Sequence, residues 1–173
     1  HARMTDKLLI GLDAGTSVIK AVAFDMDGRQ LGIASRRNSY TTLPNGGTEQ
    51  DMARTWRDAA AVLAELAETV PNLTTRTVAL GVTGQGDGTW LVDANGNPAH
   101  DGWNWTDARA ADQTRALIGT EAESVIYKIT GTGLNLCQSR TQLLWMKEHA
   151  PELLDRAGTS FHCKDWLYLK LTG

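Results

Sequence analysis

Apolar and polar positions at the start of the chain predict three strands in a row. Leu8–Leu12 and Val18–Phe24 are short runs rich in Val, Ile, Leu and Ala, as strands are. The polar turn 13–17 between them is so short that it can join only antiparallel neighbours. Gln30–Arg37 alternates between apolar and polar residues, which is typical of a third strand. The sequence therefore predicts an antiparallel three-stranded meander.

A long helix is the clearest element that the pattern predicts after the meander. Its apolar positions recur at helical spacing and are Trp56, Ala59, Ala60, Leu63, Leu66, Ala67 and Val70. Asp51 is a suitable N-cap for this helix, and Pro71 ends it. Thr77–Val82 is then predicted to be a short buried strand. A strand, a helix and a strand after a meander place the chain in the α/β class, with a mixed sheet and helices on its faces.

The second half of the chain is predicted to alternate short strands with helices. The pattern predicts strands at 89–93 and 159–162, helices from Thr106 or Asp107 to Leu117 and at 121–129, 139–149 and 165–171, and a helix start at Pro151. Ser139 and Gln142 have the spacing of a capping box, so we expect them to cap the helix that begins there.

The composition is that of a globular protein, with 42% apolar and 21% charged residues in 173. A formal net charge of -3 and the lack of a basic run argue against a nucleic-acid partner. No apolar stretch approaches the roughly 20 residues that cross a bilayer, and no apolar signal region opens the chain. We therefore expect a cytoplasmic protein without a membrane partner. Residues 1–3 precede Met4 and resemble the remnant of an expression tag.

The cysteines and histidines do not have the spacing of metal ligands. Cys137 and Cys163 form neither a disulfide framework nor a zinc motif, so we expect reduced thiols. His100, His149 and His162 lack a partner at ligand spacing, and we expect structural roles for them.

The turn after the first strand carries groups that bind phosphate. Gly15 lets the backbone approach a ligand closely. The hydroxyls of Thr16 and Ser17, together with backbone N–H groups, are suited to phosphate oxygens, and the carboxylate of Asp13 is suited to the waters around Mg²⁺. The alternative is an ordinary hairpin turn, because Asp, Gly and Thr also favour turns.

A cluster of glycines at Gly84, Gly86 and Gly88 does not have dinucleotide-binding spacing. It differs from GxGxxG, and a strand-like segment follows it instead of a helix. GxxxxGK[ST] is also missing from the sequence, which excludes a P-loop. Gln85 and Asp87 remain as polar groups suited to ligand hydroxyls, with a tight connection between two strands as the alternative.

The segment from Trp103 to Arg109 combines aromatic and charged side chains. Trp103 and Trp105 offer flat apolar faces, while Asp107 and Arg109 offer a carboxylate and a guanidinium. Sugars and polyols bind to such sets, because C–H groups pack on indoles and hydroxyl pairs bind charged groups. The alternative is a helix start with a capping Asp and buried tryptophans.

Taken in order, these segments resemble the FGGY family of carbohydrate kinases. The matching landmarks are Asp13-Ala-Gly-Thr16, Gly47-Thr-Glu49-Gln50-Asp51 before the Trp56 helix, Gly81-Val-Thr-Gly-Gln85-Gly-Asp87-Gly88, Trp105-Thr-Asp107-Ala-Arg109, Ser139 with Leu144-Trp145, and Lys164–Gly173. The resemblance covers nearly the whole chain. It implies the ribonuclease H-like, actin-type ATPase fold and transfer of the ATP γ-phosphate, with Mg²⁺, to a hydroxyl of a sugar or polyol.

The resemblance also implies roles for individual residues. It assigns phosphate and nucleotide binding to Asp13, Gly15, Thr16, Ser17 and Lys20, with Asp13 also near the metal. It assigns substrate contacts to Gln85, Gly86, Asp87, Trp105 and Asp107. A cation such as Lys20 would stabilise the charge on the transferred group.

Two departures from the family pattern bear on the predicted acceptor and on which part of the enzyme this chain represents. Glycerol kinases carry Arg where this chain has Gly86, which disfavours glycerol, and the segment looks most like kinases of the erythritol and L-xylulose type. Family members are also roughly three times as long, and their general base lies later in the first domain. We therefore expect residues 4–173 to be the N-terminal part of that domain, inactive alone and without the general base.

Two questions stay open at this point. The alternative function is a non-catalytic actin-like module that binds nucleotide as a switch, which needs the turn around Asp13 but no sugar pocket. The sequence also leaves a homodimer open as the assembly state.

Overall fold

The computed structural model describes residues 6–173 and divides them into two compact units. Unit 1 consists of the chain up to Ser39, Asp51–Gln85 and Cys163–Gly173, and unit 2 consists of Tyr40–Gln50 and Gly86–His162. Each unit is therefore assembled from segments that are far apart in the sequence. The tag remnant expected at residues 1–3 lies outside the described residues.

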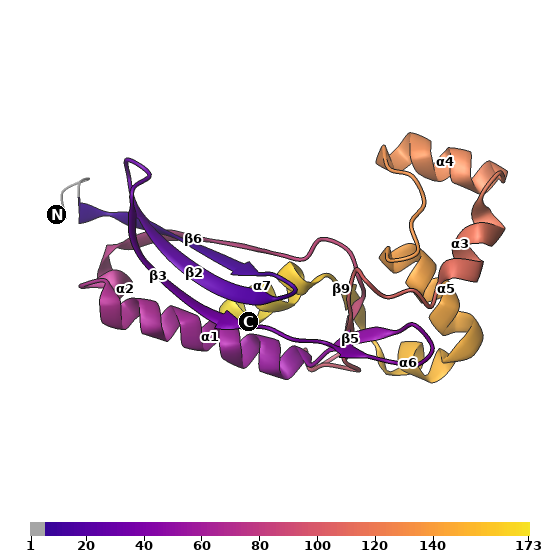
Figure 1. The fold of residues 1–173 in the computed structure, drawn as a ribbon, viewed down its shortest axis with the longest axis horizontal. Coiled ribbons are helices and arrows are strands. Elements are labelled where there is room, and N and C mark those ends of the chain that lie inside the picture. Colours follow the sequence, from indigo (N-terminus) through magenta and orange to yellow (C-terminus); the bar gives the residue numbers. More distant parts are fainter. Residues whose placement is uncertain (1–5) are drawn as a thin grey trace. The chain divides into compact units, whose positions relative to one another are not determined.

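Unit 1 contains a four-stranded mixed sheet with the order β3-β2-β1-β6 (Figure 1). Its strands are β1 (Leu8–Ala14), β2 (Val18–Asp25), β3 (Gln30–Arg37) and β6 (Thr77–Gly84). β1, β2 and β3 pair antiparallel, and β6 pairs parallel with β1. The predicted meander is confirmed.

Helix α1 (Met52–Thr69) packs on β2 and β3 and buries one face of this sheet. Asp51 is the N-cap, as predicted, because its side chain accepts a hydrogen bond from the backbone N–H of Arg54 at 2.8 Å. Leu12, Ala21 and Leu66 are fully buried in the resulting core. The short helix α2 (Leu73–Arg76) follows α1.

Helix α7 (Cys163–Thr172) returns the end of the chain to unit 1. It contacts β6 and α1. The indole N–H of Trp166 donates to the backbone carbonyl of Met52 at 3.0 Å, and Trp166 is 2% exposed. This buried hydrogen bond ties the start of α1 to the last helix.

The other face of the sheet keeps several large apolar side chains exposed. Leu9, Val18, Leu31 and Ile33 are between 38% and 51% exposed. β6 lies at the edge of the sheet, and Val78 in it is 50% exposed. The prediction that Thr77–Val82 is a buried strand was therefore wrong, because an edge strand with an uncovered face keeps alternate side chains accessible.

Unit 2 is built from short strands and helices around tryptophans. Its elements are β4 (Thr41–Thr42), β5 (Thr48–Gln50), β7 (Trp90–Val92), β8 (Gly102–Trp103), α3 (Ala111–Leu117), α4 (Glu121–Thr130), α5 (Ser139–His149), α6 (Pro151–Arg156) and β9 (Thr159–Phe161). The strands form a β4-β5-β8 sheet and a β7-β9 pair. Leu91, Trp103, Met146 and Leu153 form its core.

Two predictions about helix starts in unit 2 were wrong. The helix expected from Thr106 or Asp107 begins at Ala111. The expected capping box at Ser139 does not form, since the Ser139 hydroxyl donates to the carbonyl of Gly88 and the Gln142 side chain accepts from Thr89. In both places, polar side chains that match a local cap bind distant segments instead.

No helix among the described residues has the length and apolar character needed to cross a membrane.

Candidate functional site

The predicted phosphate turn lies at the end of β1 in unit 1 and carries an ion pair. Asp13 and Lys20 are opposite each other in the β1–β2 register. The Lys20 ammonium lies 3.5 Å from Asp13 Oδ2, and the two side chains are 47% and 36% exposed. A half-exposed pair of this kind contributes little to stability. It does, however, present a carboxylate and a cation side by side to a ligand.

The backbone of this turn is held by a residue that the sequence analysis did not single out. The N–H of Gly15 donates to the carbonyl of Val18 at 3.0 Å, and a Cβ at Gly15 would lie 2.9 Å from that oxygen. Asn38, directly after β3, donates from its side chain to the carbonyl of Gly15 at 2.9 Å and from its backbone to Ser17 at 2.8 Å. The turn is therefore fixed from both sides, with the Ser17 side chain exposed.

Gln85 lies beside this turn within unit 1. Its backbone N–H donates to the carbonyl of Ala14 at 3.2 Å, and Gln85 is 7% exposed. Cys163 packs against the same carbonyl, and burial raises the pKa of its thiol to about 12. The thiol is therefore neutral at physiological pH. The boundary between the units falls between Gln85 and Gly86.

A cavity of about 400 Å³ runs from Asp13 and Lys20 over Gly11 and Gly81 on the sheet face opposite α1. Among residues 6–173, no three His, Cys, Asp or Glu side chains are grouped so that they could hold a metal ion. Mg²⁺ commonly binds through one or two carboxylates together with phosphate oxygens and waters. The accessible carboxylate of Asp13 at the predicted phosphate turn fits that pattern.

In unit 2, Asp87 lines a polar cavity of about 290 Å³. We call this cavity the Asp87 pocket, and its lining residues are Asp87, Thr132, Gln138, Ser139, Arg140 and His162. Asp87 was predicted from the sequence, whereas the other five were not, and His162 was expected to be structural. Gly86 is exposed, and a Cβ there would meet nothing within 4 Å.

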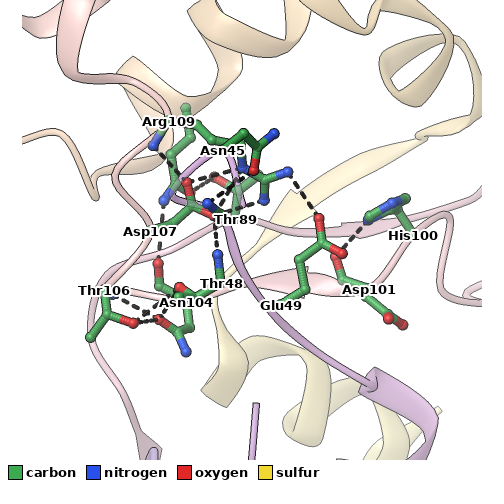
Figure 2. A network of polar contacts seen from close by, with 12 residues as sticks. Asn45, Thr48, Glu49, Thr89, His100, Asp101, Asn104, Thr106, Asp107 and Arg109 are labelled. Carbon is green, nitrogen blue, oxygen red and sulfur yellow. Dashed lines mark hydrogen bonds and ion pairs between the residues drawn. The ribbon is translucent and has the colours of Figure 1, made fainter. Parts of the chain in front are cut away.

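Arg109 is the centre of a buried charge network in unit 2 (Figure 2). Its guanidinium lies 2.7 Å from Asp107 Oδ2 and 2.9 Å from Glu49 Oε1, and it stacks 3.3 Å from the centre of the Trp103 ring. The side chain of Arg109 is 6% exposed and that of Asp107 is fully buried. A delocalised cation between two carboxylates and an indole satisfies its hydrogen bonds without water.

The same network joins segments that are far apart in the sequence. Asp107 Oδ2 also accepts the backbone N–H of Thr48 at 2.8 Å, and the Thr48 hydroxyl donates to Asn104 at 2.8 Å (Figure 2). A Cβ at Gly47 would lie 2.7 Å from the Arg109 guanidinium carbon. The segments around Gly47 and Asp107 are separate motifs in the sequence. In the structure they are held against each other by these contacts.

The two predicted substrate residues of this segment, Trp105 and Asp107, differ in how exposed they are. Trp105 is 50% exposed, whereas Asp107 and Trp103 are buried. A substrate contact by Asp107 stays a prediction. In the structure its carboxylate binds the guanidinium of Arg109 and the backbone N–H of Thr48. The exposed indole of Trp105 has the character expected of a surface for C–H groups.

Comparison with known proteins matches almost the whole chain to one family. The model of the FGGY family of carbohydrate kinases, N-terminal domain, matches residues 8–173. An erythritol kinase from Brucella abortus is 51% identical over 166 residues, which is 96% of this chain and 32% of that protein. An autoinducer-2 kinase from Salmonella typhimurium is 29% identical over 170 residues and is covered to 32%. The chain thus spans about a third of the length of the curated relatives it matches.

The solved structures agree with this match. The crystal structure of a xylulose kinase from Rhodospirillum rubrum superposes with a TM-score of 0.87 at 26% identity, covering 95% of this chain and 34% of that one. A second kinase structure, from Brucella ovis, also has a TM-score of 0.87, at 24% identity, and is covered to 33%. The likeness confirms the predicted actin-like ATPase fold with its mixed sheet.

Proposed function

We propose, since this chain belongs to the FGGY family of carbohydrate kinases, that it is the N-terminal part of an enzyme that phosphorylates a small polyol or ketose. In this proposal the γ-phosphate of ATP is transferred to a hydroxyl of the acceptor. The observation that carries the proposal is the accessible Asp13–Lys20 pair at a glycine-containing turn. Phosphoryl transfer depends on positioning and on electrostatic stabilisation, which such a pair supplies.

The phosphate half of the proposed site lies in unit 1. We assign phosphate binding to Gly15, Thr16 and Ser17, whose backbone and hydroxyls bind anions. Lys20 would stabilise the charge that spreads over the transferred group. Asp13 would hold the waters of Mg²⁺, and the ion, when bound, neutralises charge between the phosphates.

The acceptor half of the proposal rests on Gln85, Gly86, Asp87 and Trp105. Asp87 would accept hydroxyl hydrogens, and Trp105 would cover C–H groups of the acceptor. We assign Asp107 to positioning this segment through Arg109. Erythritol is the acceptor we favour, because the relative with 51% identity is an erythritol kinase, with xylulose and ribulose as the next candidates.

Several parts of the proposal concern the whole protein. We propose that residues 4–173 belong to its first domain and that its general base lies beyond Gly173, so this chain alone would have no turnover. We further propose a cytoplasmic protein that binds neither nucleic acid nor a membrane.

The alternative is a module that binds nucleotide as a conformational switch. Such a switch needs the turn around Asp13 but has no use for a polar pocket. The Asp87 pocket combines a carboxylate with hydroxyl, amide and guanidinium groups, which favours the kinase.

Thermal unfolding of the full-length protein distinguishes the two functions. We expect erythritol, xylulose or ribulose to raise the melting temperature, because a ligand at about 100 times its Kd stabilises the folded state by about 2.7 kcal/mol. Glycerol serves as the comparison acceptor and should give a smaller shift. If ATP and Mg²⁺ raise the melting temperature but none of these acceptors does, the result would favour the nucleotide-binding switch.

A further inference from the structure

One of the segments that line the Asp87 pocket is hydrogen-bonded to the turn that carries Asp87. Three hydrogen bonds join the turn Gly86–Gly88 to the loop Gly133–Ser139. The N–H of Gly88 donates to the carbonyl of Cys137 at 2.9 Å, the Ser139 hydroxyl donates to the carbonyl of Gly88 at 2.5 Å, and the Cys137 thiol donates to Asp87 Oδ2 at 3.6 Å. The position of the carboxylate is therefore set by a loop about fifty residues away in the sequence.

The thiol of Cys137 is suited to hold this carboxylate. Cys137 is 4% exposed. Burial, followed by the nearby charge of Asp87, raises the pKa of the thiol to about 11. The thiol therefore keeps its proton at physiological pH, and it donates that proton to Oδ2. Asp87 lines the cavity, so the carboxylate that Cys137 holds borders the space that a ligand would occupy.

The loop itself is held in shape by Gln138 and Arg140. The Gln138 side chain accepts the N–H of Asn135 at 3.1 Å and the Nε–H of Arg140 at 2.8 Å, and it donates to the carbonyl of Gly133 at 3.2 Å. Arg140 also donates to the Thr132 hydroxyl at 3.0 Å. Arg140 lies in α5, and its guanidinium holds the loop through N–H donors in a fixed planar arrangement.

The chemistry of the lining indicates the class of ligand. The lining residues offer one carboxylate, one guanidinium that is already partly engaged, an imidazole, an amide and two hydroxyls. Such a mixture of donors and acceptors suits a neutral molecule with several hydroxyls. The volume of about 290 Å³ lies at the small end of ligand sites.

We propose that Cys137 and Arg140 are positioning residues for the acceptor site: Cys137 fixes the carboxylate of Asp87, and Arg140 fixes the loop opposite it. This inference rests on the proposed kinase function and extends it to residues that the sequence did not indicate. Cys137 acts through Asp87, and Arg140 acts through Gln138 and Thr132.

Steady-state kinetics of the full-length protein with erythritol and ATP test this inference. Cys137→Ala removes the donor to Asp87 and should raise the KM for erythritol about tenfold, the size expected for one hydrogen bond to a charged group. The KM for ATP should stay within about twofold, since nothing in the phosphate turn changes. Cys137→Ser retains a donor and should recover most of the affinity for erythritol.

Arg140 is tested in the same assay with a matched control. Arg140→Met should raise the KM for erythritol by about fivefold or more, because Gln138 and Thr132 each lose a charge-assisted hydrogen bond. Lys147→Met removes a cation from the exposed side of the same helix and should leave both KM values unchanged.

The outcomes separate the inference from the proposed function. A wild-type protein without acceptor-dependent ADP release would overturn the proposed function itself. An active wild type whose Cys137→Ala and Arg140→Met variants keep the wild-type KM for erythritol would overturn only the inference. Equal changes in both KM values, without recovery in Cys137→Ser, would also overturn it, because they indicate a merely structural role. If Cys137→Ala does not fold, Cys137→Ser and Arg140→Met decide the question by the same criteria.

Discussion

Asp13→Ala in the full-length protein is expected to abolish kinase turnover and to leave acceptor binding intact. Asp13 lies at the turn that we assign to phosphate and Mg²⁺, and its carboxylate is accessible. Loss of a single preorganised group in a transfer site already costs about 10²–10³ in rate. We expect a loss of about a thousandfold or more, measured as ADP release with saturating ATP and erythritol.

The variant should fold normally, because the contact that it removes is weak. An ion pair with both side chains more than a third exposed contributes at most about 1 kcal/mol. Asp27→Ala removes an exposed carboxylate from another turn of the same meander and should keep wild-type activity. Turnover that survives in Asp13→Ala would contradict the assignment, and loss of both turnover and erythritol binding would identify Asp13 as a folding residue.

Asp107→Ala is expected to destabilise unit 2 more than a typical point mutation does. Asp107 is fully buried and holds Arg109, which is 6% exposed, together with the backbone of Thr48. Asp107→Ala leaves Arg109 with Glu49 as its remaining carboxylate and removes the acceptor of the Thr48 N–H. Breaking a buried ion pair by removing one partner typically costs about 3–5 kcal/mol. Urea unfolding of the chain, followed by tryptophan fluorescence, measures this loss because Arg109 stacks on Trp103.

Two further variants make the Asp107 experiment decisive. Asp101→Ala removes an exposed carboxylate close to the same segment and should change the free energy of unfolding by less than about 0.5 kcal/mol. Asp107→Asn retains the shape and one acceptor, so we expect an intermediate loss. A loss under about 1 kcal/mol in Asp107→Ala would contradict the positioning role. A stable variant with a raised KM for erythritol would instead support direct substrate contact.

Elements that depend on local pattern could be predicted from the sequence. β1 and β2 follow from short apolar runs joined by a tight turn, and β3 follows from alternating apolar and polar residues. α1 follows from helical spacing with Asp51 as its cap. The order of the family landmarks indicated the fold. In these places neighbouring residues determine both the element and its ends.

Features that depend on distant partners could not be predicted. Asp107 and Ser139 look like helix caps in sequence, yet they bind Thr48 and Gly88, which lie more than fifty residues away. The same holds for Asn38, which follows β3 and donates a hydrogen bond to the predicted phosphate turn. Cys137 gives no local signal, because its role depends entirely on Asp87.

The assembly of each unit from separate parts of the sequence could not be predicted for the same reason. Tyr40–Gln50 is followed directly by α1 of unit 1, yet it pairs through β5 with β8 in unit 2. A contact between strands separated by about fifty residues leaves no periodic pattern in either segment. The segments that carry the candidate site residues could be named from the sequence, but their grouping into units required the structure.

ADP release by the full-length protein, with and without erythritol in the presence of ATP and Mg²⁺, tests the proposed function most directly. We predict ADP release that depends on erythritol, and none from the 173-residue chain under the same conditions. ADP release that is the same with and without every small polyol and ketose tested, or clear turnover by the 173-residue chain alone, would contradict the proposal.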